Sequence, residues 1–208
     1  LGMSIHESQS LLVEMQVCRS RAFLGYAAPL MREAFAAESK DGDPAWGPEN
    51  LYRLYTRVKP GFIRVDADEV TYPAHVILRY RLEQAMITGA LAIADLPAAW
   101  NRGMAELLGI TPPDDASGCL QDIHWYDGAF GYFPTYTLGA VAAAQFFAAA
   151  GQSEADIAPG IARGDFAPLM GWLRDNVHCK ASLVTTDELM RQATGETLGT
   201  QAFKRHLE

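Results

Sequence analysis

Apolar residues recur every three to four positions along most of the chain, which is the spacing of one face of an α-helix. A first long helix is predicted from about residue 8 to residue 25, with Leu11, Met15 and Cys18 on its apolar face. Pro29 is expected to interrupt the helical pattern that follows. The pattern predicts further helices at about residues 30–37, 50–58, 74–94, 97–108, 134–151, 154–162, 166–177, 187–193 and 201–208. The chain is therefore expected to be mainly helical.

Several of these helices carry recognisable end signals. Gly109 follows an apolar helical run and is expected to cap its C-terminal end. Thr185 and Glu188 have the spacing of a capping box, and Gly195 follows as the stop of the same helix. The sequence therefore fixes the ends of two helices more closely than periodicity alone does.

The helix predicted at residues 74–94 has a distinct apolar face. That face holds Ile77, Leu78, Leu82, Ala85 and Met86. Arg79, Arg81 and Glu83 are placed off this face by the same helical spacing.

A small β element is predicted near residues 62–72, where a brief strand at 62–65 follows a Pro-Gly stop and a second strand is placed at 70–72. Residues 39–48 (SKDGDPAWGP) are dense in Gly, Pro, Asp and Ser and are expected to form a hinge-like loop. No internal repeat or low-complexity tract is found. Residues 1–208 are therefore expected to form a single compact domain.

Composition narrows the class of protein. The 208 residues are 49% hydrophobic and 20% charged, which is enough apolar material for a sizeable core. The net charge is −8 and the basic residues are scattered, which argues against a nucleic-acid partner. The stretch from residue 128 to residue 153 lacks charge, but its second half is mostly alanine. It is therefore interpreted as a loop feeding a buried helix, not as a membrane span.

The cysteines and the first residues indicate the setting of the protein. Cys18, Cys119 and Cys179 are far apart and odd in number, so they form neither a disulfide framework nor a CxxC zinc pattern. A reducing, cytoplasmic location fits best. The start of the chain lacks the basic and apolar regions of a signal peptide. Leu1 does not resemble a natural start, and the chain is expected to be part of a longer protein.

Two short blocks hold candidate ligand-binding residues. His6–Gln9 (HESQ) begins a helix, where Glu7 either favours the helix dipole or ligates zinc with His6 as its hydrogen-bond partner. Arg64, in the block IRVDAD, either forms an internal salt bridge or grips an anionic ligand group such as a carboxylate.

Two further blocks hold candidate catalytic residues. His124 lies in Gly118–Trp125 (GCLQDIHW) and is either a satisfied structural histidine or a neutral donor aimed at developing negative charge. Tyr136 follows an aromatic, glycine-containing loop. Its ring either fills the core or places its hydroxyl in a cleft as a second donor to an oxyanion.

Taken together, these blocks resemble the Taq-type metallocarboxypeptidases, a family of zinc carboxypeptidases with a neurolysin-like helical fold. HESQ, IRVDAD and GCLQDIHW match three signature blocks of that family in the family's order. Further similarity extends over nearly the whole chain. Family members also carry an HExxH helix before the HESQ block, with two histidine ligands and the general base. The chain begins only a few residues before His6, so the resemblance implies a C-terminal portion lacking that helix.

The resemblance also implies roles for individual residues. Glu7 is expected to be the third ligand of a catalytic zinc, or of cobalt in its place, with both histidine ligands upstream of this chain. Arg64 is expected to bind the C-terminal carboxylate of a peptide substrate, and His124 and Tyr136 to stabilise the oxyanion. Supporting positions around these residues are His6, Gln9, Asp68, Gln121 and Asp122. Asp122 is expected to orient His124, and Asp68 to brace Arg64.

The expected parent protein is a cytoplasmic carboxypeptidase acting on peptides with a free C-terminus, and a homodimer as the family implies. This chain alone is expected to be inactive, because one ligand cannot hold a catalytic zinc. The alternative is a non-enzymatic helical module for interaction or dimerisation. The missing HExxH and the apolar helices at both ends favour that alternative.

Overall fold

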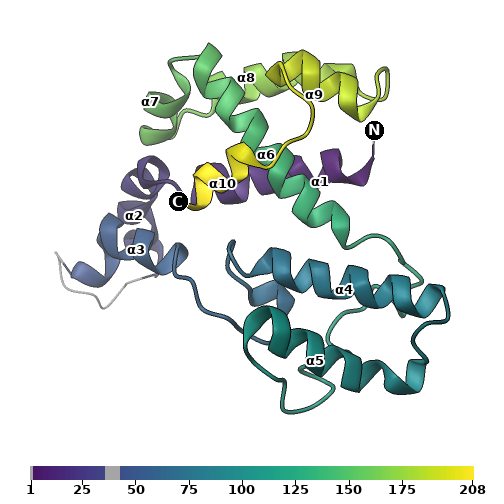
Figure 1. Ribbon diagram of the computed structural model, residues 1–208. Helices are drawn as coiled ribbons and strands as arrows, with labels where there is room; N and C mark the ends of the chain where they lie inside the picture. The colour runs from purple at the N-terminus through teal and green to yellow at the C-terminus, as the bar shows by residue number, and fades with distance from the viewer. Residues whose placement is uncertain (1, 36–42) are drawn as a thin grey trace. The chain divides into compact units, whose positions relative to one another are not determined.

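The computed structural model describes residues 2–35 and 43–208, and these residues are mainly helical with no β-strand among them (Figure 1). They form two compact units. One unit holds Leu1–Arg57 and Leu138–Glu208, and the other holds Val58–Thr137. The single domain predicted from the sequence stays a prediction, and each unit is described by itself.

The N-terminal helices of the first unit differ from the prediction. A π-helix and then a break at Arg19 and Ser20 divide the region predicted as one helix. Pro29 lies inside a helix and does not end it. Proline has no N–H to donate to the carbonyl four residues earlier, that of Gly25, and because Gly25 is exposed this carbonyl can hydrogen-bond to water instead. The elements are α1 (Met3–Leu11), the π-helix η1 (Leu12–Cys18) and α2 (Arg21–Phe35).

The remaining helices of the first unit enclose an apolar core. Leu12, Phe146 and Leu189 are completely buried in it, together with several alanines that let the helices approach closely. The elements are η2 (Pro44–Trp46), α3 (Pro48–Tyr55), α6 (Pro134–Ser153), α7 (Ile157–Ala162), α8 (Ala167–Asn176), η5 (His178–Lys180), α9 (Thr186–Thr194) and α10 (Gln201–Leu207). Helix α6 begins in the second unit and continues in the first from residue 138.

The predicted end signals are confirmed. Thr185 and Glu188 form both hydrogen bonds of a capping box at the start of α9. Gly195 ends that helix with φ 81° and Gly109 ends α5 with φ 70°, conformations that favour glycine. Of the predicted hinge-like loop 39–48, residues 39–42 lie outside the described residues. Its remainder forms η2 and begins α3.

The second unit is built on two helices that lie side by side, α4 (Tyr72–Ile87) and α5 (Leu96–Leu108) (Figure 1). Trp100 and Met104 of α5 are buried against Leu78 of α4. Gly103 permits this approach, since a β-carbon there would collide with Leu78. The short 3-10 helices η3 (Arg64–Asp66) and η4 (Ile93–Asp95) precede α4 and α5. Residues 109–133 contain turns and no helix.

The prediction of a β element near residues 62–72 is wrong. This segment forms η3 and a turn into α4, without a strand. The backbone N–H of Arg64 donates to Gln121 Oε1 at 2.8 Å instead of to a neighbouring strand. The carboxylate of Asp68 accepts hydrogen bonds from the N–H groups of Val70 and Thr71. Side chains therefore satisfy the backbone donors that a sheet would have used.

Helix α4 also differs from the prediction, because it is buried on two sides. Arg79 and Glu83, which helical spacing placed off the apolar face, are 0% and 2% exposed. Ile77, which was placed on that face, is 42% exposed. Arg81 is exposed, as its position off the face predicts.

No helix within the described parts of the chain is long and apolar enough to cross a membrane. This includes α6, whose second half is rich in alanine.

Candidate functional site

Asp122 joins two buried arginines in the second unit. Its Oδ1 accepts from Arg64 Nε at 3.0 Å and from Arg64 Nη2 at 2.6 Å. Its Oδ2 accepts from Arg79 Nε at 2.6 Å and lies 2.5 Å from Arg79 Nη2. The side chains of Arg64, Arg79 and Asp122 are 7%, 0% and 10% exposed. The loop before α4, α4 itself and the segment 109–133 thus meet at one carboxylate.

Gln121 completes this cluster. Its Oε1 accepts from the backbone N–H of Arg64 and from Arg79 Nη2, at 2.8 and 2.9 Å. Its Nε2 lies within 3.1 Å of the carbonyl oxygens of Phe62, Ser117 and Gly118. Both ends of the amide are therefore occupied, which fixes its orientation.

The charges of this cluster stabilise each other. Burial acts to raise the pKa of Asp122, but the hydrogen bonds and positive charges of Arg64 and Arg79 outweigh burial and hold that pKa below its ordinary value. Burial is also the main cause that lowers the pKa of Arg79 to about 10, so Arg79 stays charged at neutral pH. Its guanidinium lies 4.5 Å from the ring centroid of Trp100, a favourable cation–π distance.

Arg64 has the internal contacts expected of a structural ion pair. Besides its bonds to Asp122, its Nη1 donates to the hydroxyl of Tyr72 at 2.6 Å. These hydrogen bonds use three of the five N–H donors of a guanidinium. The role of Arg64 in binding a substrate carboxylate stays a prediction, which the two remaining donors leave open.

His124 and Tyr136 are brought together, as the prediction of a shared role requires. His124 Nε2 lies 3.0 Å from the Tyr136 hydroxyl, and the His124 ring packs on Phe133 with centroids 4.3 Å apart. Burial, followed by the positive charge of Arg64, lowers the pKa of His124. The imidazole is therefore neutral at pH 7, which is the form expected of a donor to developing negative charge.

The close contact of His124 and Tyr136 restricts what the pair can do. One hydrogen occupies the gap between Nε2 and the hydroxyl oxygen, in whichever direction it is donated. If Nε2–H donates to Tyr136, the hydroxyl hydrogen is directed away from His124. If the hydroxyl donates to Nε2, the imidazole hydrogen lies on the buried Nδ1 and the hydroxyl has no second hydrogen to donate. The contact therefore provides one outward donor at most.

Glu7 lies in the first unit, on the side of α1 that packs closely against α6. A β-carbon built at Gly139 of α6 would lie 3.0 Å from the Glu7 β-carbon. Glu7 is half-buried, whereas His6 is exposed. Successive helical residues project about 100° apart, so the two side chains leave α1 in different directions. Support of Glu7 by His6 stays a prediction.

The other supporting residues make identifiable contacts. Gln9 donates to the Ser8 hydroxyl at 2.9 Å, and its Oε1 lies 2.9 Å from His178 Nε2. Asp68 accepts from the backbone of Lys59 at 2.9 Å, in addition to capping the turn into α4. The carboxylate that braces Arg64 in the structure is that of Asp122.

Sequence reasoning missed two buried residues of α4, Arg79 and Glu83. Glu83 Oε1 accepts from the indole N–H of Trp125 at 2.7 Å, and its Oε2 accepts from the backbone N–H of Gly131 at 3.0 Å. A signal was present, since His75, Arg79 and Glu83 are four residues apart and share one helix face. A polar stripe at that spacing indicates either a solvated face or a buried polar contact.

The described residues do not hold a complete metal site. Across residues 2–35 and 43–208, no group of three or more His, Cys, Asp or Glu side chains is arranged to bind a metal ion. A catalytic zinc takes three protein ligands. The described residues therefore do not supply the three ligands of a catalytic zinc by themselves, and ligation of a metal by Glu7 stays a prediction.

Comparison with known proteins identifies similar chains of the same fold. Metallocarboxypeptidase 1 of Trypanosoma cruzi has 42% identity and a TM-score of 0.92, covering 100% of this chain and 42% of that chain. The M32 carboxypeptidase of Deinococcus radiodurans R1 has 41% identity and a TM-score of 0.91, covering 100% of this chain and 41% of that chain. Thermostable carboxypeptidase 1 of Thermus thermophilus is 40% identical over 208 residues, covering 100% of this chain and 40% of the relative.

These relatives place the chain among mainly helical metallopeptidases. The family model of the carboxypeptidase Taq (M32) metallopeptidases matches residues 1–208, and the chain belongs to that family. The resemblance inferred from the three sequence blocks is thereby confirmed. The chain spans about two fifths of the length of the relatives it matches.

Proposed function

We propose that this chain is the C-terminal portion of a zinc-dependent carboxypeptidase with a neurolysin-like fold. The whole protein would remove single residues from peptides with a free C-terminus, in the cytoplasm and as a homodimer. The observation that carries the proposal is the contact between His124 and Tyr136, a neutral imidazole and a hydroxyl 3.0 Å apart within blocks that match the family.

Glu7 is the residue of this chain that would ligate the metal, zinc or cobalt. Two histidines of an upstream HExxH helix would supply the other ligands. The bound metal would lower the pKa of a water molecule and polarise the scissile carbonyl. The packing of α1 against α6 at Gly139 supports this role, because it holds the backbone of Glu7 in a defined place.

Tyr136 would donate to the oxyanion that forms at the scissile carbonyl, and His124 would act behind it. Of the two hydrogen arrangements, only donation from His124 Nε2 to Tyr136 directs the hydroxyl hydrogen away from the imidazole, as donation to a substrate requires. In that arrangement the imidazole orients the hydroxyl and strengthens it as a donor. A donor of this kind is typically worth about 3 kcal/mol of activation free energy.

Arg64 would bind the terminal carboxylate of the peptide through the two donors that its internal contacts leave. Asp122 and Tyr72 hold the guanidinium in place before substrate arrives, and Gln121 holds the backbone N–H of Arg64, which reduces the ordering cost of binding. Arginine suits this role because its planar donors match the geometry of a carboxylate. Recognition of a terminal carboxylate would exclude internal peptide bonds.

The experiment that tests this function measures release of an amino acid from an N-blocked dipeptide in the presence of zinc. It compares this chain with the protein extended upstream to include the HExxH helix. Release by the extended protein alone is expected. Turnover and tight zinc binding by this chain alone would contradict the assignment of a single ligand. If neither protein releases an amino acid, the non-enzymatic helical module becomes the better proposal.

A matched pair of variants tests Glu7 in the extended protein. Glu7→Gln removes the proposed ligand charge and is expected to lower zinc affinity at least tenfold. Glu14→Gln changes an exposed carboxylate seven residues further along the same region, where it pairs with Arg19 at 2.6 Å. The control is expected to bind zinc like the unchanged protein. Equal affinities for both variants would exclude Glu7 as a ligand.

A further inference from the structure

The segment 109–133, which carries His124, has no regular secondary structure to hold it. Its own hydrogen bonds are those of turns, such as the bond from the Ala129 N–H to the carbonyl oxygen of His124 at 2.8 Å. Loops of this kind depend on contacts to neighbouring elements for a defined conformation. The position of His124 therefore depends on what anchors this segment.

Glu83 of α4 is one such anchor, and the sequence blocks do not include it. Its side chain is 2% exposed, and an unpaired carboxylate in that environment would be strongly unfavourable. Each of its oxygens accepts one hydrogen bond from the loop, from Trp125 Nε1 at 2.7 Å and from the Gly131 N–H at 3.0 Å. The two donors are six residues apart, so one carboxylate ties together both sides of the loop that follows His124.

The indole that donates to Glu83 belongs to Trp125, the residue next to His124. Trp125 meets Trp100 edge to face with centroids 6.1 Å apart, and it meets Phe133 in the same way at 6.0 Å. The His124 ring also packs on Phe133, so the two neighbouring side chains share this contact. Because consecutive residues share a peptide plane, an indole held by a hydrogen bond and two rings restricts the backbone position of His124.

We propose that Glu83 is a positioning residue for His124, acting through Trp125 and Gly131. This inference rests on the proposed function for the role of His124, whereas the positioning itself is a property of this chain. Glu83 touches neither substrate nor metal in the proposal. It sets the place of the imidazole, and hence of the Tyr136 hydroxyl that the imidazole contacts.

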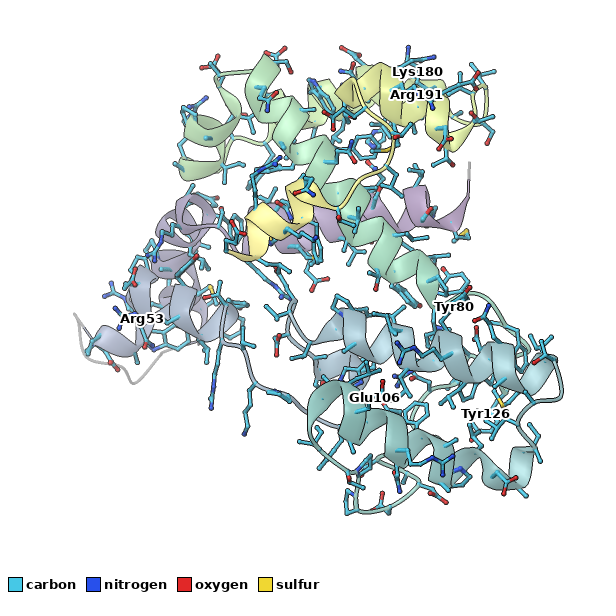
Figure 2. The ribbon with its side chains drawn as sticks, in the orientation of Figure 1. Arg53, Tyr80, Glu106, Tyr126, Lys180 and Arg191 are labelled. Carbon is cyan, nitrogen blue, oxygen red and sulfur yellow. The ribbon has the colours of Figure 1, made fainter. Side chains whose placement is uncertain are left out.

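Glu83→Gln is the informative variant, because it keeps the shape of the side chain. Its amide oxygen still accepts one of the two hydrogen bonds, whereas its NH₂ group meets the other donor. Glu83→Asp keeps the charge and both acceptor oxygens on a side chain one methylene shorter. Glu106→Gln is the matched control on α5, because Glu106 is an exposed carboxylate paired with Arg81 at 3.3 Å (Figure 2).

Two nuclear magnetic resonance signals of the 208-residue chain provide the test, the Trp125 indole N–H and the pH titration of the His124 ring. The charged groups acting on His124 are Arg64 and Arg79, which lower its pKa, and Asp122 and Glu83, which raise it. In Glu83→Gln we expect a displaced indole signal and a lower His124 pKa. Glu83→Asp should restore much of that pKa, and Glu106→Gln should match the unchanged chain. A Glu83→Gln chain with both signals unchanged would overturn the proposal.

Kinetics of the extended carboxypeptidase separate this inference from the proposed function. Glu83→Gln should lower kcat about tenfold to a hundredfold with KM changed less than about twofold, because a small displacement of a catalytic group affects the transition state most. Glu106→Gln should leave both constants unchanged. An extended protein without activity would contradict the proposed function. The resonance signals of the 208-residue chain would still show whether Glu83 positions His124. Equal kcat for Glu83→Gln and Glu106→Gln would overturn the positioning role.

Discussion

The Oδ1 atom of Asp122 lies 3.9 Å from Nδ1 of His124, about 1 Å beyond hydrogen-bond distance. Nδ1 is buried and has no hydrogen-bond partner, while both carboxylate oxygens of Asp122 are taken by arginines. Asp122 therefore does not orient His124 through a hydrogen bond in this structure. The contacts that orient His124 include the Tyr136 hydroxyl at its other nitrogen and the rings of Phe133 and Tyr132.

Removal of the Tyr136 hydroxyl tests which group donates to the oxyanion. Tyr136→Phe in the extended protein is expected to lower kcat for dipeptide hydrolysis about 10²- to 10³-fold, the usual loss for one oxyanion donor. His124→Gln should have a smaller effect if the imidazole acts through Tyr136. Tyr126→Phe, at an exposed tyrosine of the segment 109–133, is the control and should retain full activity (Figure 2). A Tyr136→Phe enzyme as active as the control would refute the assignment.

Asp122→Asn should destabilise the chain strongly. The substitution keeps the shape of the side chain but leaves Arg64 and Arg79 buried without their negative partner. Breaking a buried ion pair in this way costs about 3–5 kcal/mol of unfolding free energy. Urea unfolding would measure the loss. Asp175→Asn, at an exposed position of α8, is the control and should change stability by less than about 0.5 kcal/mol.

The same carboxylate predicts part of the acid sensitivity. The pKa of Asp122 is lower in the folded chain than in the unfolded chain, because Arg64 and Arg79 outweigh the effect of burial. Its contribution to stability is therefore complete above the unfolded pKa of about 4 and is lost as the pH falls through the folded pKa. Asp122→Asn should remove this low-pH component, and an unchanged acid limb would contradict the depressed pKa.

The buried side chain of His75 predicts a second loss of stability on acidification, which begins at a higher pH than the loss due to Asp122. The residue is completely buried, and neither ring nitrogen has a hydrogen-bond partner. Burial, and then the charges of Arg79 and Arg64, lower its pKa from 6.5 to about 4, against the opposing charges of Asp122 and Asp68. The unfolded chain therefore binds a proton between pH 6.5 and 4 that the folded chain does not. About 3 kcal/mol of unfolding free energy should be lost as the pH falls across this range.

His75→Leu removes that titration and two unpaired polar atoms. The variant is expected to be at least as stable as the unchanged chain at pH 7.5, as measured by urea unfolding. Between pH 7.5 and pH 4.5 it should lose much less unfolding free energy. Some decline should remain, since the pKa of His124 is also lowered in the folded state. Parallel pH profiles for the two chains would show that His75 does not titrate as inferred.

Much of the fold could be predicted because its signals are local. Gly109, Gly195 and the Thr185–Glu188 pair act within one helical turn, so their spacing alone places helix ends. Pro29 and the predicted strand at 62–65 could not be assigned in this way. The helix continues through Pro29 because Gly25 is exposed, and residues 62–65 form no strand because the side-chain amide of Gln121 accepts from Arg64. Neither fact can be predicted from the neighbouring residues.

The same distinction applies to the candidate site. The block around His124 could be found because its chemistry-bearing residues are close together in sequence. The burial of Arg79 and Glu83 could not be predicted, because helical spacing shows which residues share a face but not whether that face meets solvent or another segment. Their partners, Asp122 and Trp125, lie 43 and 42 residues away along the chain. Only the folded arrangement reveals that a polar stripe of α4 is buried.

Gly139→Ala tests the close approach that holds Glu7. The added β-carbon would lie 3.0 Å from the Glu7 β-carbon, 3.1 Å from the Ser4 carbonyl oxygen and 3.2 Å from Leu11 Cδ1. Two of these atoms cannot move without the α1 backbone, so α1 should be displaced from α6. The expected loss is about 1–3 kcal/mol of unfolding free energy, measured by urea titration.

Gly151→Ala provides the matched control, because it lies on the same helix with no atom within 4 Å of its added β-carbon. There the substitution should stabilise the chain by up to about 1 kcal/mol, since alanine is the better helix former. Opposite signs for the two variants would therefore isolate the contact with α1 from helix propensity. In the extended protein, Gly139→Ala should also weaken zinc binding, because displacement of α1 moves Glu7. Unchanged zinc affinity in a destabilised Gly139→Ala protein would mean that the packing at Gly139 supports the fold and not the metal ligand.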